Sequence, residues 1–357
     1  MTDATAVGGK RAGIVQTVLG PVDPAALGAT QPHEHLLVDL ARGRRSATAT
    51  VADRDRWTEE IRLDNYHDVR RLEHLYRDNL RLTSVEDAVE EMARFRAAGG
   101  GCIVDATCAD LGRDPAGLVR IAVAAGVHVV MGCGHYTAGY HPPWVAAAAE
   151  EAIADAMVRD ATDGVDGTGV RAGVIGEIGL DWPVHPQEAK VLRAAVAAQR
   201  ATGLALLVHP GRSPAAPLDV VGRVLEAGGD PRRLVICHLD RTLFAERDFA
   251  ELARTGCWLE LDLFGQEQSY YPPAPEVDMP NDAIRVRHLA ALMDRGHAGQ
   301  LLVSQDICVK ARLRRYGGEG YDHLLRNVVP LMRRKGMSDA DIEQLLVRNP
   351  AGALAGG

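Results

Sequence analysis

Near its start this chain carries the segment Ala29-Thr30-Gln31-Pro32-His33-Glu34-His35-Leu36. Side chains two apart on a β-strand project from the same face, so His33 and His35 can both reach one metal ion. Glu34, between them, points to the opposite face. The stretch therefore predicts a strand that ends in a pair of metal ligands.

Four more metal-binding side chains each end or follow a short apolar run: Glu177, His209, His238 and Asp306. A single histidine after an apolar run is usually a packed, hydrogen-bonded core residue. Repetition of the same arrangement along the chain indicates a metal centre instead.

Eight apolar, strand-like runs alternate with amphipathic helical stretches: 29–36, 102–107, 127–133, 174–177, 204–209, 234–238, 258–263 and 301–306. This alternation predicts an α/β fold, a (β/α)₈ TIM barrel with its active site at the carboxyl ends of the strands. All six metal-binding residues fall there. We expect residues 1–357 to form a single metal-dependent hydrolase domain, with residues 1–12 disordered.

The ends and loops decorate this barrel. Residues 13–28 predict an N-terminal strand and turn that cap its floor or rim. Three long segments, 39–82, 264–282 and 307–321, are expected to surround the catalytic mouth. Thr83 and Glu86 predict a capping box for a helix over 85–98, and a last helix opening at Ser338 is expected to stop before Asn349-Pro350.

Composition excludes several classes of function. The net charge of −8 argues against nucleic acid as a partner, because phosphate binding needs a basic surface. No run approaches the ~18 apolar residues of a membrane span, and the first residues lack the apolar core of a signal peptide. We expect a cytoplasmic protein without a membrane partner, whose six scattered cysteines are reduced.

The ligand set predicts two divalent ions, with zinc as the first choice and manganese, iron or cobalt also suited. Their charge would lower the pKa of a bridging water and polarise a substrate oxygen. Asp306 is the expected catalytic proton acceptor. We assign His33, His35 and Asp306 to a buried ion, His209 and His238 to a more open ion, and Glu177 to the bridge between them.

Longer motifs accompany these ligands: Gly176-Glu177-Ile178-Gly179 with Trp182-Pro183, His209-Pro210-Gly211-Arg212-Ser213, His238-Leu239-Asp240-Arg241-Thr242, Asp262-Leu263-Phe264-Gly265, and Tyr316-Gly317-Gly318 with Gly320-Tyr321. Together they resemble the phosphotriesterase-related proteins, in the phosphotriesterase branch of the amidohydrolase superfamily. The resemblance runs over essentially the whole chain, from Val15 to Pro350.

The resemblance implies a binuclear hydrolase whose metal-bridging hydroxide attacks the carbonyl of a small-molecule amide or ester. Related proteins hydrolyse N-acyl amides of small sulfonates or amino acids, as N-acyltaurine hydrolases do, so an N-acyl amino acid or N-acyl amino sulfonate is the expected substrate. True phosphotriesterases carry a carboxylated lysine where this chain has Glu177, and a histidine where it has Leu263. Lactonase or aryldialkylphosphatase-like activity is the alternative, and a barrel that binds without chemistry is disfavoured by the intact ligands.

Six residues are candidates for substrate binding: His135, Tyr136, Arg212, Arg241, Lys310 and Tyr321. Arg241 and Arg212 follow metal ligands closely and could hold an anionic group by paired hydrogen bonds. A salt bridge from Arg241 to Asp240 or Asp262 is the structural alternative. Assembly as a homodimer is left open.

Overall fold

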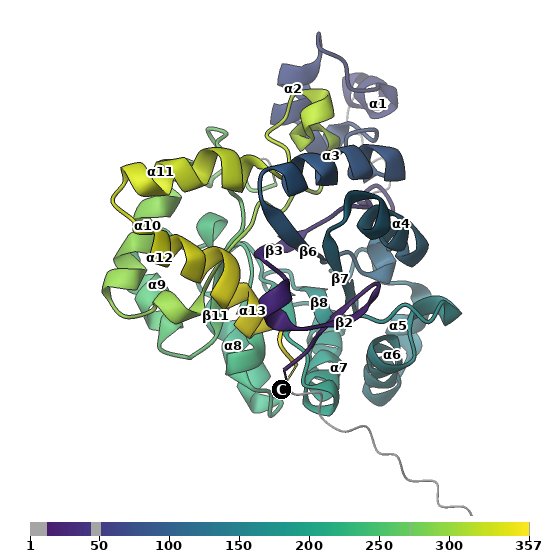
Figure 1. Ribbon diagram of the computed structural model, residues 1–357. Coiled ribbons are helices and arrows are strands. Elements are labelled where there is room, and N and C mark those ends of the chain that lie inside the picture. The colour runs from purple at the N-terminus through teal and green to yellow at the C-terminus, as the bar shows by residue number, and fades with distance from the viewer. Residues whose placement is uncertain (1–12, 44–50, 272, 357) are drawn as a thin grey trace, which may run out of the picture.

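The computed structural model describes residues 13–43, 51–271 and 273–356. Residues 1–12, expected to be disordered, lie outside the described residues. Eight parallel strands form one sheet in the order β12-β11-β10-β9-β8-β7-β6-β3, with helices packed around it (Figure 1). The strands are β3 (Ala29–Glu34), β6 (Gly100–Asp105), β7 (His128–Cys133), β8 (Val174–Gly179), β9 (Leu206–His209), β10 (Leu234–Ile236), β11 (Trp258–Leu261) and β12 (Leu301–Val303).

The first and last strands of this sheet meet and nearly close it into a barrel. The backbone oxygen of His33, on β3, accepts hydrogen bonds from Ser304 Oγ at 2.7 Å and from the backbone N–H of Asp306 at 3.3 Å. Ser304 Oγ also accepts the backbone N–H of His33 at 3.1 Å. The predicted (β/α)₈ barrel is therefore confirmed, and its closure joins two of the predicted metal-binding segments.

Most helices lie between successive barrel strands: α3 (Val85–Ala97), α4 (Pro115–Ala125), α5 (Pro143–Ala147), α6 (Glu150–Thr162), α7 (Pro186–Thr202), α8 (Ala216–Glu226), α9 (Glu246–Ala253) and α10 (Asp282–Asp294). Helix α3 shows how the ends are set. Its N-cap is Ser84, whose hydroxyl accepts the N–H of Asp87 at 3.0 Å. The predicted capping box of Thr83 and Glu86 was therefore wrong by one residue. Adjacent hydroxyls can both cap a helix, and packing of its buried face decides the register.

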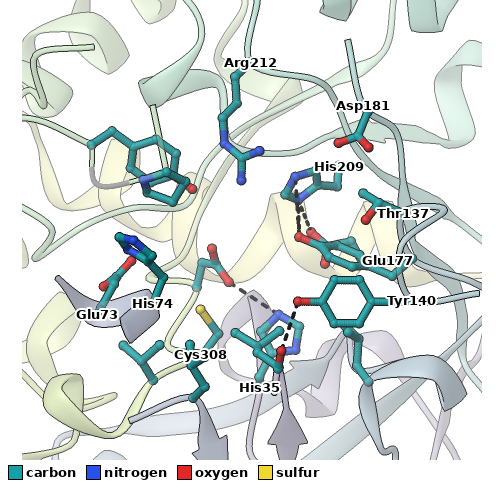
Figure 2. Close-up of a pocket in the computed structure, with 18 residues that line it drawn as sticks. His35, Glu73, His74, Thr137, Tyr140, Glu177, Asp181, His209, Arg212 and Cys308 are labelled. Atoms are coloured by element: carbon teal, nitrogen blue, oxygen red, sulfur yellow. Dashed lines mark hydrogen bonds and ion pairs between the residues drawn. The ribbon is translucent and has the colours of Figure 1, made fainter. Parts of the chain in front are cut away.

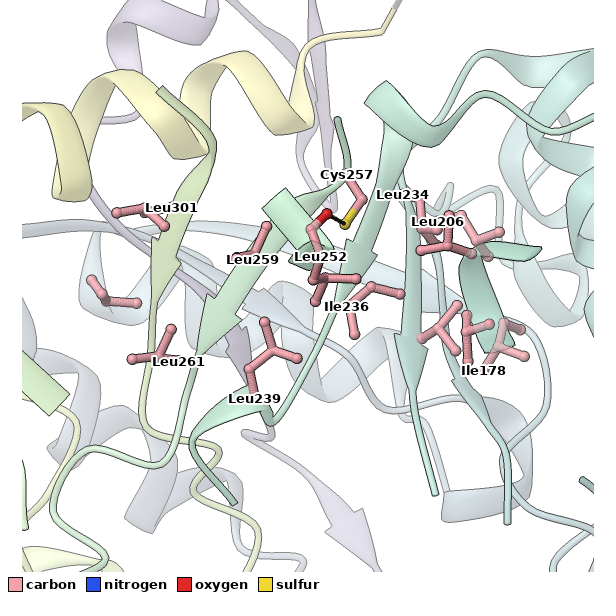
Figure 3. Packing of buried hydrophobic residues seen from close by; sticks show 14 of the residues in the cluster. Ile178, Leu206, Leu234, Ile236, Leu239, Leu252, Cys257, Leu259, Leu261 and Leu301 are labelled. Carbon is pink, nitrogen blue, oxygen red and sulfur yellow. Dashed lines mark hydrogen bonds between the residues drawn. The ribbon is translucent and has the colours of Figure 1, made fainter. Parts of the chain in front are cut away.

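Alternation along the strands divides the apolar core into two layers. One layer lies between the strands and the surrounding helices, and Figure 3 shows part of it on the neighbouring strands β8 to β12, including Leu206, Ile236 and Leu259. Residues of the opposite parity, such as Leu207 and Val235, belong to a separate cluster inside the barrel. Strands buried on both faces explain why each apolar run in the sequence is nearly continuous.

The amino-terminal end of the barrel is closed by the two ends of the chain. Hairpin strands β1 (Val15–Thr17) and β2 (Gly20–Val22) supply Val15 to the inner cluster, and helix α13 (Asn349–Leu354) supplies Leu354. The N–H of Gly356 donates to Ile14 O at 3.0 Å. This closure matches the predicted strand cap and leaves the carboxyl end of the barrel as the accessible one.

The last part of the chain departs from expectation at Asn349-Pro350. Helices α11 (Val329–Arg334) and α12 (Asp339–Glu343) are followed by a π-helical turn over Gln344–Arg348, and α13 continues through the proline. The predicted stop before Asn349 was therefore wrong. Pro350 has no N–H to donate, and the π-helical turn just before it, in which the Asn349 N–H donates to Gln344 O, accommodates the proline within the continuous helix.

The first long loop contains its own elements: strands β4 (Val38–Asp39) and β5 (Arg81–Leu82), and helices α1 (Val51–Thr58) and α2 (Tyr66–Arg71). It packs against the long segment 307–321, where the Tyr66 hydroxyl donates to Ala311 O at 2.8 Å. Within the ranges given above, no helix is both long enough and apolar enough to cross a bilayer.

Candidate metal centre

The six predicted metal ligands meet at the carboxyl end of the barrel. His33 and Glu177 lie within strands, His209 ends β9, and the other three stand one to three residues after the ends of their strands. All are buried except Asp306, whose side chain is 14% exposed. The fold thus gathers ligands from five strands into one buried cluster that opens to solvent at Asp306.

Glu177 stands at the centre of this cluster. Its Oε1 lies 2.8 Å from His238 Nε2, 3.0 Å from His209 Nδ1 and 3.4 Å from His33 Nε2. Burial alone would raise the pKa of Glu177, but His209 and His33 hold it well below its usual range. One carboxylate in contact with imidazoles from three strands has the position of a bridging ligand.

Asp306 completes a second group on the side of β3. Its Oδ1 lies 3.4 Å from His35 Nε2 and 4.0 Å from His33 Nε2. The donor atoms of His33, His35 and Asp306 lie within 4.8 Å of one another, as do those of His33, Glu177 and His238. His33 therefore belongs to both groups, whereas Glu177 and His238 belong only to the second.

The donor atoms fit divalent metals. His33 Nε2 is buried and has no hydrogen-bond partner, which is unfavourable unless it binds something else. Imidazole nitrogens and carboxylate oxygens are the ligands of zinc, manganese, iron and cobalt sites. Burial lowers the pKa of His209 well below its usual value, which keeps that imidazole in the neutral form that binds metals.

Two ligands are presented by unusual backbone. His238 and Asp306 adopt left-handed conformations, with φ of 54° and 49°. Such values are uncommon outside glycine and often mark functional positions. The turn at each residue aims the side chain back across the end of its strand, and sequence patterns do not reveal it.

Each histidine of the cluster is oriented by a second group. His35 Nδ1 lies 2.9 Å from Thr107 Oγ1, and His238 Nδ1 lies 2.9 Å from Asp262 Oδ1. Burial alone would lower the pKa of His238, but Asp262 and Glu177 raise it to about 9. These surroundings are negatively charged and favour a bound cation.

A cavity of about 250 Å³ opens beside the cluster (Figure 2). Of the predicted substrate contacts, Tyr136 and Arg212 line it. Figure 2 shows the Arg212 guanidinium reaching into the pocket from the side opposite His35 and Cys308. Sequence reasoning missed most of the other polar lining residues: Glu73, His74, Thr137, Tyr140, Asp181, Tyr271 and Cys308.

Arg241 lies behind the pocket wall and is 1% exposed. Its Nη2 donates to Pro210 O at 3.1 Å and lies 3.1 Å from His209 Nε2. Arg241 does not form the alternative salt bridge to Asp240, because Asp240 pairs with Arg285 at 2.6 Å. Arg241 and Arg212 both lie near one aromatic ring, with guanidinium carbons 5.6 and 5.5 Å from the centre of Tyr271.

The structure places the other three candidates outside the lining of this cavity. Lys310 pairs with Asp78, and the Tyr321 hydroxyl donates to the backbone oxygen of His35 at 2.7 Å. Both residues line a smaller cavity beside α3. His135 Nδ1 lies 2.7 Å from Asp110 Oδ1. The hydrogen bond from Tyr321 thus helps to hold the backbone of the predicted ligand His35 in place.

Comparison with known proteins gives the relatives of this barrel. The model of the phosphotriesterase family matches residues 13–354. An N-acetyltaurine hydrolase from Tetraodon nigroviridis is 41% identical over 339 residues, which cover 95% of this chain and 97% of that protein.

Solved structures agree. A resiniferatoxin-binding protein from Rhodobacter sphaeroides superposes with a TM-score of 0.91 at 37% identity, covering 96% of this chain and 95% of that one. A phosphotriesterase homology protein from Escherichia coli, complexed with phosphate in its active site, gives 0.76 at 26% identity, covering 93% and 100%. With the buried histidine and carboxylate cluster, these matches show that the chain belongs to the phosphotriesterase family, metal-dependent hydrolases of the amidohydrolase superfamily.

Proposed function

We propose that this protein hydrolyses the amide bond of a small N-acylated amino sulfonate or amino acid, with two divalent metal ions held by the six-residue cluster. The observation that carries the substrate class is Arg212, a cationic side chain in the same cavity as the ligands. The name of the Tetraodon relative, N-acetyltaurine hydrolase, supports the same chemistry. A cavity of about 250 Å³ suits a small substrate.

Two divalent ions, with zinc as the first choice, would supply an activated water and polarise the substrate carbonyl. The protein's own residues then do the positioning. Asp306, at the mouth of the cluster, accepts a proton at Oδ2, since Oδ1 faces His35 at 3.4 Å. Its partial exposure to the cavity lets it pass that proton to the leaving amine.

Tyr136 and Arg212 orient the substrate at its two ends. The Tyr136 hydroxyl lies 3.3 Å from His209 Nδ1, beside the ligand cluster, and can donate a hydrogen bond to a substrate oxygen there. Arg212 is half-buried, and its Nε is a buried donor without a partner. The rest of its guanidinium reaches into the cavity (Figure 2), where a sulfonate or carboxylate would accept a charge-assisted hydrogen bond from it.

Phosphotriester hydrolysis is the less favoured alternative. Leu263 occupies the place of the histidine of true phosphotriesterases, and it is fully buried in an apolar cluster with Tyr271, Ala274 and Met279. It offers no group that could carry a proton away from the site. Lactone opening is the competing activity.

A substrate panel tests the proposal. Metal-free protein reloaded with Zn²⁺ or Mn²⁺ is assayed on N-acyl amino sulfonates, N-acyl amino acids, lactones and an aryl dialkyl phosphotriester. We expect the highest kcat/KM on an anionic N-acyl amide. Faster turnover of neutral lactones or triesters than of every N-acyl anion would favour the alternative.

The setting we propose follows from composition. A net charge of −8 fits a small-molecule enzyme without a nucleic-acid partner. We propose a cytoplasmic, single-domain enzyme with no membrane partner, and leave a homodimer open.

A further inference from the structure

Strand β11 brings two carboxylates into the interior of the barrel, beneath the metal cluster. Glu260 and Asp262 stand at alternate positions and are both 0% exposed. Cys237, which directly follows the neighbouring strand β10, and His33 lie with them, and the four donor atoms are within 4.8 Å of one another. Two buried carboxylates are costly for the fold, so a role outside stability is expected of them.

Both carboxylates face one nitrogen of His33. His33 Nδ1 lies 3.3 Å from Glu260 Oε2 and 3.4 Å from Asp262 Oδ2. The other nitrogen, Nε2, faces Glu177 and Asp306 and has no hydrogen-bond partner. The ring is thus directed with one nitrogen toward an acceptor and the other toward the ion positions.

The two carboxylates differ in what else they hold. Asp262 is committed to His238, because its oxygens lie 2.9 Å from His238 Nδ1 and accept the His238 backbone N–H at 3.0 and 3.1 Å. Glu260 Oε2 faces His33, and its Oε1 is buried without a hydrogen-bond partner. Asp262 therefore serves one metal ligand and Glu260 another.

We propose that Glu260 is a positioning residue for the metal centre: it accepts the proton of His33 Nδ1 and so keeps the Nε2 lone pair directed at the ions. This inference rests on the proposed two-metal site. A carboxylate behind a histidine fixes its tautomer and ring orientation and raises its basicity as a ligand. Glu260 would do this for the histidine that both donor groups share.

The arrangement predicts opposite effects on metal binding and on stability. Glu260→Gln keeps an acceptor for Nδ1 but removes the charge, and Glu260→Met removes both. Metal affinity should fall from wild type to Gln to Met. The metal-free protein should be at least as stable in both variants, because each lacks a buried carboxylate with an unpaired oxygen. A carboxylate that only supports the fold would give the reverse.

The experiment titrates Zn²⁺ into metal-free protein against a chromophoric chelator and records the melting temperature of the same samples. We expect wild type to bind two ions, and Glu260→Gln to bind at least one of them about 10- to 100-fold more weakly. Its melting temperature without metal should equal or exceed that of wild type.

Glu188→Gln is the matched control. Glu188 is equally buried, and its carboxylate accepts the backbone N–H groups of Ala138, Asp181 and His185. This variant should melt lower than wild type and keep wild-type Zn²⁺ affinity.

The outcomes separate the two claims. If wild type binds two ions and both Glu260 variants bind them equally well, the positioning role is refuted while the metal site stands. A lower melting temperature with unchanged affinity also refutes it. If wild type binds no Zn²⁺, both this role and the proposed function fail.

Discussion

Replacement of Arg212 by alanine separates recognition of the substrate's anionic group from hydrolysis itself. Arg212 lines the cavity and carries a buried Nε–H without a partner. A hydrogen bond to a charged group contributes about 1.5–3 kcal/mol, and each 1.36 kcal/mol is a factor of ten in rate. Loss of one such bond should therefore lower kcat/KM for an anionic substrate about 10- to 150-fold, mainly through KM.

The assay compares two substrates that share the same acyl group. One is an N-acyl aminoethanesulfonate and the other an N-acyl ethanolamine, which has a neutral hydroxyl in place of the sulfonate. The loss should be confined to the sulfonate. Equal losses on both substrates would mean that Arg212 acts on the structure of the pocket and does not bind the anionic group.

Two further variants serve as controls. Arg232→Ala removes the same charge from an exposed position that precedes β10, at the opposite end of the barrel, and should leave both substrates unaffected. Arg241→Ala removes a buried guanidinium that contacts Pro210 and His209, so it should reduce turnover of both substrates alike.

Three other changes have defined outcomes. Asp306→Asn should lower turnover at least ~10²-fold, because the amide cannot accept a proton. Its melting temperature should stay near wild type, since asparagine tolerates the φ of 49° at this position. Wild-type turnover in this variant would mean that Asp306 acts only as a metal ligand. Arg285→Met should lower the free energy of unfolding by about 3–5 kcal/mol in urea titrations, because Arg285 is fully buried between Asp240 and Asp282 and both carboxylates would lose a partner. A loss under about 1 kcal/mol would show that these two ion pairs are dispensable for stability. Burial alone would raise the pKa of Asp282, but His323 and Arg285 lower it, so Asp282 stabilises the fold above its unfolded pKa and loses this contribution as the pH falls through the lower folded pKa. Asp282→Asn should therefore be less stable than wild type at neutral pH, with a difference that shrinks below about pH 4. A stability difference independent of pH would contradict this assignment.

The barrel and its ligands could be predicted because each depends on a local pattern. Glu177 and His209 end continuous apolar runs, and a parallel barrel brings all such strand ends together. The pairing of Glu260 and Asp262 on one inner face could have been found in the same way, since they are acidic residues at alternate positions of an apolar strand.

The pocket wall could not be predicted to the same degree. Arg212 and Arg241 each stand three residues after a ligand, yet one lines the cavity and the other is buried behind it. Their placement depends on the segment 264–282, whose Tyr271 ring lies near both guanidinium groups. Lys310 does not line the cavity, because it pairs with Asp78 in the segment 39–82. Contacts between loops distant in the sequence leave no periodic signal.

The metal content of the purified protein decides whether the cluster is a two-metal site. Elemental analysis of purified wild-type protein should find about two divalent ions per chain, and chelation should remove both the ions and the hydrolase activity, which Zn²⁺ or Mn²⁺ should restore. Glu177→Ala, which removes the carboxylate shared by three histidines, should hold fewer than two ions. Trace metal in wild type, with full activity after chelation, would contradict the account.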